Sequence, residues 1–119
     1  MKVALLEGIH EVAKENLTLK GHQVELFKQS YSGDELIDLL KDFEAVGIRS
    51  KTQMTEKVLQ NSKHLNAVGC FCIGTNQVDL NSAKNLGIPV FNAPHSNTRS
   101  VAELVLCEVV ALSRNLFDM

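Results

Sequence analysis

The sequence predicts an α/β fold of flavodoxin type: a five-stranded parallel sheet with helices on both faces, plus a long apolar C-terminal helix. Three observations lead to this prediction. Five short runs rich in Val, Ile and Leu alternate with segments of helical composition. Capping and turn residues separate the two kinds of segment. Strict alternation requires right-handed crossovers and a parallel sheet, and five strands fit the flavodoxin-like order better than a six-stranded dinucleotide fold.

The strands are predicted where apolar side chains form compact runs, as expected for strands that are buried on both faces of a parallel sheet. The predicted strands are residues 2–7, 22–27, 45–49, 65–73 and 88–91. The predicted helices are residues 10–20, 35–43, 55–62, 80–86 and 100–117.

Cap residues mark several helix boundaries. Gly21 and Gly87 follow helical segments and suit the left-handed residue that often ends a helix. Ser32 stands three residues before Glu35, which is the spacing of a capping box. Asp79 precedes the fourth helical segment and is expected to cap its N-terminus.

The last predicted helix has an unusual composition. Between Val101 and Leu112 only Glu103 and Glu108 are charged, and most other residues are Val, Ala or Leu. A helix that is apolar around most of its circumference is expected to be buried on several sides. A domain of this size can cover one side, so we expect a partner subunit or a further domain to cover the other.

Composition excludes several classes of protein. The chain has 119 residues, which predicts one domain or part of one. A formal net charge of −2 argues against non-specific nucleic-acid binding. No run of apolar residues is long enough to span a membrane, and no signal-peptide pattern stands at the N-terminus. Three cysteines, an odd number, fit reduced thiols and a cytoplasmic location better than a disulfide framework.

The cysteines do not predict a metal site. Cys70 and Cys72 are two residues apart in a predicted strand and supply at most two ligands, whereas a structural zinc ion needs four. Cys107 lies in a predicted helix, and no histidines stand at paired spacing. We therefore expect Cys70 and Cys72 to pack as small apolar residues, and no metal to bind.

A dinucleotide site is not predicted either. The fingerprint requires G-x-G-x-x-G between a strand and a helix. Here only Gly74 stands in such a turn, because Gly69 lies inside the predicted strand. The chain also lacks a phosphate-binding P-loop motif.

Three strand ends together favour a pocket for an anionic substrate, since ligands of open parallel sheets bind at the carboxyl ends of the strands. Residues 49–52 supply two cations and two hydroxyls, and residues 73–76 form a glycine turn whose backbone N–H groups a ligand can approach. Ser100 and Glu103 form a second capping-box pattern at a helix N-terminus, which favours anions. Each feature alone favours a solvated loop, and only the three features together make the two interpretations equal.

Two long segments carry a family resemblance. IRSKTQMTEKVL and AVGCFCIGTNQVDLNSAKNLGIPVFNAPHSNTRSVAELVL resemble the substrate domain of the D-isomer-specific 2-hydroxyacid dehydrogenases. The similarity spans essentially the whole chain and is densest over residues 47–106. CFCIGTNQVDL, FNAP and SNTRSVAEL are similar to the branch that acts on 3-phosphoglycerate. Cys72 and Asn76 replace the Gly and Asp usual in the wider family.

The resemblance implies an activity and a set of binding residues. The branch oxidises 3-phosphoglycerate to 3-phosphohydroxypyruvate with NAD, in L-serine biosynthesis. By resemblance, Arg49 meets the substrate's phosphate, with Ser50 as a further candidate. Ile73 and Gly74 correspond to the loop whose amides hold the carboxylate. The remaining two candidates are Asn97, which closes the substrate side of the cleft, and Lys51, which replaces an arginine and so removes a bidentate phosphate contact.

The resemblance also implies that this chain lacks the catalytic machinery. In the family, the nicotinamide site and the catalytic Arg, Glu and His lie in a later domain. We therefore expect no catalytic residue and no NAD site here, and no turnover by this chain alone. The four histidines are not expected to substitute: His10, His22, His64 and His95.

The expected organisation follows from the same resemblance. Residues 1–97 are expected to belong to the substrate-binding domain. Residues 98–119 are expected to connect toward an NAD-binding domain and a dimer partner, with homo-oligomerisation through residues 100–117.

One alternative is a non-enzymatic flavodoxin-like binding or signalling module, such as a receiver domain. Receivers need clustered acidic residues at the ends of the first and third strands. These ends here are Glu7-Gly8 and Arg49-Ser50, so the third strand ends in a charge of the wrong sign.

Overall fold

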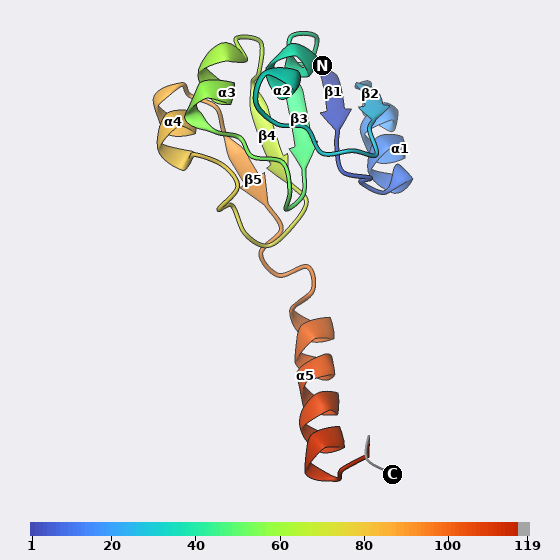
Figure 1. The fold of residues 1–119 in the computed structure, drawn as a ribbon. Coiled ribbons are helices and arrows are strands. Elements are labelled where there is room, and N and C mark those ends of the chain that lie inside the picture. The colour runs from blue at the N-terminus through green and yellow to red at the C-terminus, as the bar shows by residue number, and fades with distance from the viewer. Residues whose placement is uncertain (117–119) are drawn as a thin grey trace.

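The computed structural model describes residues 1–116 and contains one five-stranded, fully parallel sheet (Figure 1). The strand order is β2-β1-β3-β4-β5, so the predicted flavodoxin-like order is confirmed. The strands are β1 (Lys2–Leu5), β2 (Gln23–Leu26), β3 (Ala45–Ile48), β4 (Ala67–Cys70) and β5 (Val90–Asn92). The helices are α1 (Glu11–Leu19), α2 (Gly33–Leu40), α3 (Glu56–Asn61), α4 (Leu80–Asn85) and α5 (Thr98–Ser113).

Helices α2, α3 and α4 cover one face of the sheet and build the larger core. Because side chains alternate along a strand, Ala4, Val46 and Val68 point to this face. They pack with residues of the three helices, among which Leu36 and Leu40 of α2 are fully buried. Burial of large aliphatic side chains contributes roughly 1.5–3 kcal/mol each, so this layer holds most of the fold's stability.

Helix α1 covers only part of the opposite face. A smaller core lies there, in which Val3, Leu5 and Val24 are buried. Beyond α1 the face is occupied by Phe71 and Phe91, whose side chains remain 44% and 63% exposed. The prediction of helices on both faces is therefore confirmed, with the β4–β5 side of the α1 face open.

The predicted helix ends are confirmed at three positions. Gly21 and Gly87 adopt left-handed φ angles of 86° and 70° after α1 and α4. The Asp79 carboxylate accepts a hydrogen bond of 2.9 Å from the Ser82 N–H and so caps α4. Ser32 is the N-cap of α2, but its side chain makes no capping bond, so the predicted box with Glu35 does not form.

Two predicted elements have different bounds. The fourth strand was predicted over 65–73 but ends at Cys70, after which the chain turns toward α4. The last helix was predicted over 100–117; it begins at Thr98 and ends at Ser113, and residue 117 lies outside the described part of the chain. Arg114 is its C-cap.

Helix α5 does not pack on the sheet. Figure 1 shows it projecting beyond the carboxyl ends of the strands. Among its residues only Ala111 is buried, and large apolar side chains such as Leu106 and Leu112 are 65% and 69% exposed. The expectation that the domain covers one side of this helix was wrong, because the chain between β5 and α5 carries it away from the sheet. No helix within residues 1–116 is long and apolar enough to cross a membrane.

Candidate functional site

A polar cavity of about 470 Å³ lies where β1, β2 and β3 end. Three of the lining side chains are cationic and one is anionic, which leaves a formal excess of two positive charges. We call this cavity the anion pocket, and its lining residues are Glu7, Lys28, Gln29, Ser30, Arg49, Ser50 and Lys51.

The structure brings together three of the residues that the sequence predicted. Arg49, Ser50 and Lys51 follow β3 directly and line the same cavity. Lys28 and Ser30 also line it but were missed by the sequence analysis. The available signal was that β2 is adjacent to β1 in the flavodoxin-like order, so the residues after β2 reach the same edge of the sheet.

Glu7 was also missed as a member of this site. Its Oε2 accepts hydrogen bonds from the backbone N–H groups of Arg49 at 2.5 Å and Thr52 at 3.3 Å. Its Oε1 accepts one from the Lys51 N–H at 2.8 Å. Partial burial alone would raise the pKa of Glu7, but these bonds to the ionised form outweigh it and hold the pKa below the ordinary value of 4.5.

Ile73 and Gly74 lie in the loop between β4 and α4. Within residues 1–116 no hydrogen bond uses the backbone N–H of either residue, so both can donate to a ligand. The Asn92 side-chain amide donates to the Ile73 carbonyl at 2.7 Å and holds the loop against the end of β5. A Cβ atom at Gly74 would lie 2.8 Å from the Oδ1 of Asn76, so a larger residue here would displace the exposed Asn76 side chain.

Gln77 connects this loop with the anion pocket. Its side chain is only 4% exposed, and its Nε2 donates to the Arg49 carbonyl oxygen at 2.8 Å. The same Nε2 lies 3.0 Å from the sulfur of Cys72, whose thiol is also directed at the Gly74 carbonyl, 3.3 Å away. The β3 and β4 ends are therefore held together by a buried amide that the sequence analysis did not identify.

Asn97 and the start of α5 do not join the anion pocket. Asn97 is the N-cap of α5, makes no side-chain capping bond, and does not line the cavity. The predicted capping box at Ser100 and Glu103 was wrong, because the helix already begins at Thr98. Glu103 instead pairs with Arg99, with 2.7 Å between its Oε1 and the Arg99 Nε. Ile73 and Gly74 do not line the cavity either, but the hydrogen bond from Gln77 to the Arg49 carbonyl joins their loop to the cation cluster, so two of the three predicted features are connected.

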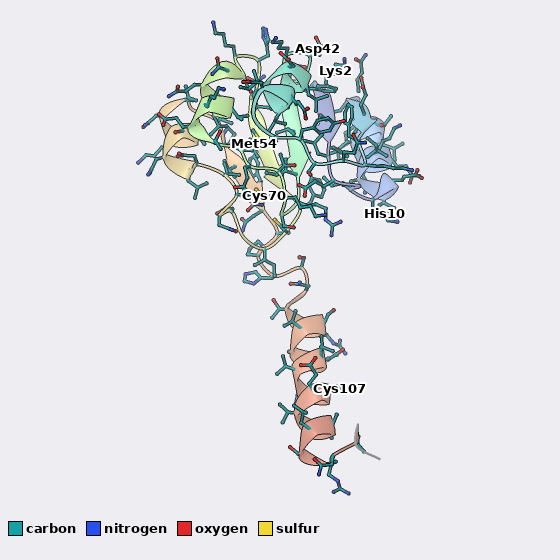
Figure 2. All side chains as sticks on the ribbon, viewed as in Figure 1. Lys2, His10, Asp42, Met54, Cys70 and Cys107 are labelled. Atoms are coloured by element: carbon teal, nitrogen blue, oxygen red, sulfur yellow. The ribbon has the colours of Figure 1, made fainter. Side chains whose placement is uncertain are left out.

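The prediction that Cys70 and Cys72 pack as small apolar residues is confirmed for Cys70 and in part for Cys72, which is half-buried against the same core. Cys70 is 3% exposed in the larger core, and burial chiefly, with the neighbouring Cys72 thiol second, raises its pKa to about 11. Cys72 is half-buried and lies just past the end of the strand. Figure 2 shows Cys107 on α5, away from Cys70. No group of three potential metal ligands occurs among the described residues.

Comparison with known proteins extends over nearly the whole chain. The family model described as "D-isomer specific 2-hydroxyacid dehydrogenase, catalytic domain" matches residues 3–115. D-3-phosphoglycerate dehydrogenase 1 of Saccharomyces cerevisiae is 53% identical over 99% of this chain and 25% of its own length. The D-3-phosphoglycerate dehydrogenase of Haemophilus influenzae is 52% identical over 98% of this chain and 28% of its own length. The chain thus spans about a quarter of the curated relatives it matches.

Solved structures share the fold. The TT0316 protein of Thermus thermophilus superimposes with a TM-score of 0.85 at 22% identity, over 99% of this chain and 38% of that one. The apo D-lactate dehydrogenase of Escherichia coli gives a TM-score of 0.76 at 26% identity, over 99% of this chain and 39% of that one. A formate dehydrogenase of Staphylococcus aureus, solved in complex with NAD, gives 0.81 at 23% identity, over 99% of this chain and 40% of that one.

Proposed function

The chain belongs to the D-isomer-specific 2-hydroxyacid dehydrogenases, and from this premise we propose that it is the substrate-binding portion of an enzyme that oxidises 3-phosphoglycerate to 3-phosphohydroxypyruvate in L-serine biosynthesis. The anion pocket is the single observation that carries the proposal. Its excess of two positive charges matches a phosphate monoester, which carries roughly −1.5 to −2 at neutral pH.

The two ends of the substrate bind at two different loops. Arg49 and Lys51 hold the phosphate, with the Ser50 hydroxyl as a further donor. Ile73 and Gly74 hold the carboxylate through their backbone N–H groups, which no residue among 1–116 occupies. The hydrogen bond from Gln77 to the Arg49 carbonyl keeps these two loops at a fixed separation. Asn97 closes the substrate side of the cleft when further parts of the enzyme are present.

NAD is the cofactor of the proposed reaction, but the residues of this chain do not fit it. Gly74 is the only glycine in the turn between β4 and α4, and a dinucleotide fingerprint needs three. No side chain among the described residues is assigned to hydride transfer or to proton transfer. The chain alone therefore binds substrate and does not turn it over.

The remaining features concern assembly and location. Residues 1–97 form the substrate-binding domain, and residues 98–119 connect it toward an NAD-binding domain. Exposed apolar side chains on α5, such as Leu106 and Leu112, support homo-oligomerisation through this helix. The reduced, unpaired cysteines support a cytoplasmic location.

Replacement of Arg49 tests the phosphate site. Arg49→Ala removes a charge-assisted contact of the phosphate, which is worth roughly 1.5–3 kcal/mol, so we expect 3-phosphoglycerate to bind at least about tenfold more weakly. Titration calorimetry or NMR measures the affinity. The matched control is Lys14→Ala, which removes an exposed cation on α1, away from the anion pocket.

The same NMR titration separates the two ends of the substrate. Inorganic phosphate should shift the signals of the residues that line the anion pocket but not those of Ile73 and Gly74, whereas 3-phosphoglycerate should shift both sets. Equal affinity of Arg49→Ala and the unmodified chain would contradict the phosphate assignment. Production of NADH by the pure 119-residue chain would contradict the assignment as a binding portion only.

A further inference from the structure

Among residues 1–116, Glu7 is the one residue that is hydrogen-bonded to both cation-bearing loops of the anion pocket. Its backbone N–H donates to the Gln29 carbonyl at 3.0 Å, in the loop that carries Lys28. Its carboxylate accepts from the backbone of the loop that carries Arg49 and Lys51. The two loops are far apart in the sequence. Glu7 connects them, because its side chain bonds to one loop and its backbone N–H bonds to the other.

The backbone of Glu7 is in an uncommon conformation that this role requires. Its φ angle is 61°, and Gly8 follows with 65°. A left-handed conformation costs a residue with a side chain on the order of 1 kcal/mol, and such strain is typically retained at functional sites. Glycine would adopt this left-handed conformation without strain, as it does at the next position. We infer that the Glu7 side chain makes interactions that offset the strain.

The hydrogen bonds to Glu7 also determine how an anion can bind. The N–H groups of Arg49, Lys51 and Thr52 all donate to the carboxylate, so they are not available to a phosphate. Arg49, Lys51 and Thr52 can therefore hold an anion only through their side chains. Side-chain binding requires that the backbone of these residues be held still, which is what three bonds to one carboxylate achieve.

We propose that Glu7 is a positioning residue of the anion pocket, which orders residues 49–52 and holds Arg49 and Lys51 in place for the phosphate of the substrate. This inference rests on the proposed function for the identity of the ligand. The ordering of the loop itself can be tested without that ligand.

The substitution Glu7→Gln distinguishes two roles for Glu7, because the two roles predict opposite changes in anion affinity. If Glu7 were only a nearby negative charge, Glu7→Gln would strengthen anion binding, because it removes repulsion from the pocket. Glutamine keeps the length of the side chain, but an NH2 group replaces one of the two oxygens and cannot accept a hydrogen bond, so either the bond from Lys51 or the bonds from Arg49 and Thr52 are lost. For a positioning residue we expect binding of 3-phosphoglycerate and of inorganic phosphate to weaken by about tenfold.

The matched control is Glu15→Gln, which removes the same charge from an exposed position on α1 outside the anion pocket. This variant should bind both anions as the unmodified chain does. Equal or tighter anion binding by Glu7→Gln would overturn the positioning role.

A pH titration of the unmodified chain tests the same role without a variant. The charged side chains that line the pocket beside Glu7 are Lys28, Arg49 and Lys51. Glu7 is the only carboxylate among these lining residues. The amide proton signals of Arg49, Lys51 and Thr52 should shift together, with one common midpoint below 4.5.

The direction of the stability change follows from the lowered pKa. Between the folded value and 4.5 the unfolded chain binds more protons, so the contribution of Glu7 to stability is present above 4.5 and is lost as the pH falls through the folded value. Amide signals of residues 49, 51 and 52 that do not follow a common titration would overturn the loop-ordering role, whether or not 3-phosphoglycerate binds. An intact titration without binding of 3-phosphoglycerate to the unmodified chain would support the ordering role and overturn the proposed function instead.

Discussion

Cys70 and Cys72 stand two residues apart, and their thiols have different surroundings. Cys70 is buried among the apolar side chains under α2, α3 and α4, and burial raises its pKa to about 11. Cys72 lies beyond the strand, where its sulfur is near the Gln77 amide. Cys107 is exposed on α5 (Figure 2). Reactivity of a thiol requires both access and the thiolate form, so the three cysteines should differ.

We expect Cys107 to be alkylated first, Cys72 more slowly, and Cys70 at least about tenfold more slowly than Cys107 at pH 8. With a pKa of about 11, only about one Cys70 thiol in a thousand is ionised at that pH, and its side chain is 3% exposed. Time-resolved labelling with iodoacetamide and peptide mass spectrometry measures the three rates. In Cys107→Ser the rates of the other two should not change. Labelling of Cys70 in the native chain as fast as Cys107 would contradict the burial assigned to it.

The sequence predicted those site residues whose charge and position next to a strand end both point to ligand binding. Arg49 and Lys51 combine positive charge with the end of a strand, and both line the cavity. Glu7 and Gln77 could not be found in this way. Their partners lie 42 to 45 and 28 residues away along the chain, and the bonds depend on strand adjacency and on the φ angle of Glu7. Composition and spacing contain no signal for either.

At the scale of elements, helix ends were predicted correctly where a single residue type decides the geometry. Gly21 and Gly87 have the left-handed φ angles that glycine adopts easily. The start of α5 was predicted wrongly because Asn97 and Ser100 are both suitable N-caps, and only the path of the chain selects between them. The end of β4 was placed too late because the residues after Cys70 continue the apolar pattern while the backbone has already turned.

Two glycines on neighbouring strands provide a matched test of packing. Gly47 of β3 and Gly69 of β4 are register partners on the α1 face. A Cβ at Gly47 would lie 2.6 Å from the Leu5 Cδ2 and 2.8 Å from the Phe71 Cε2. The nearest atom to a Cβ at Gly69 would be 3.5 Å away, which is an ordinary contact.

Gly47→Ala should therefore lower the free energy of unfolding by about 1–3 kcal/mol, since Leu5 is buried and must be displaced. Gly69→Ala should be neutral or stabilise the fold by up to about 1 kcal/mol, because alanine loses less backbone entropy in a strand. Urea unfolding followed by circular dichroism compares them. Equal destabilisation by both substitutions would show that the close approach at Gly47 is not what distinguishes the two positions.

At the scale of the whole molecule, the topology was predictable because it follows from the alternation of strands and helices and from the handedness of their connections. The shape was not. The Cα radius of gyration is 17.8 Å, whereas a compact chain of this length has about 13.5 Å. The difference comes from α5, whose apolar side chains are exposed although the composition alone predicted burial. The sequence of such a helix predicts that its apolar side chains will be buried, but not which part of the protein or which partner covers them.

We expect the chain to self-associate through α5, in a manner that depends on concentration. Val109 and Leu112 lie three residues apart on one side of this helix and are 55% and 69% exposed. The double substitution Val109→Lys and Leu112→Lys should weaken association by about tenfold or more, because each apolar side chain contributes roughly 1.5–3 kcal/mol when buried. Sedimentation velocity over a range of concentrations measures the association.

The control for this prediction is Leu19→Lys, which replaces a side chain of α1 that is 85% exposed. It should associate as the unmodified chain does. A chain that remains monomeric at all concentrations, or an equal effect of the control, would contradict a role of α5 in self-association.

The separation of α5 from the sheet also has a mechanical consequence. Its 16 residues form a stiff rod about 24 Å long, connected to β5 by the short segment of residues 93–97. A rotation of about 10° within that segment displaces the far end of the rod by about 4 Å, given the same rise per residue. Such a rotation would not move the residues that line the anion pocket, because α5 contributes none of them. The helix therefore has the geometry of a lever arm, in which a small backbone rotation next to the sheet would give a large displacement at the far end.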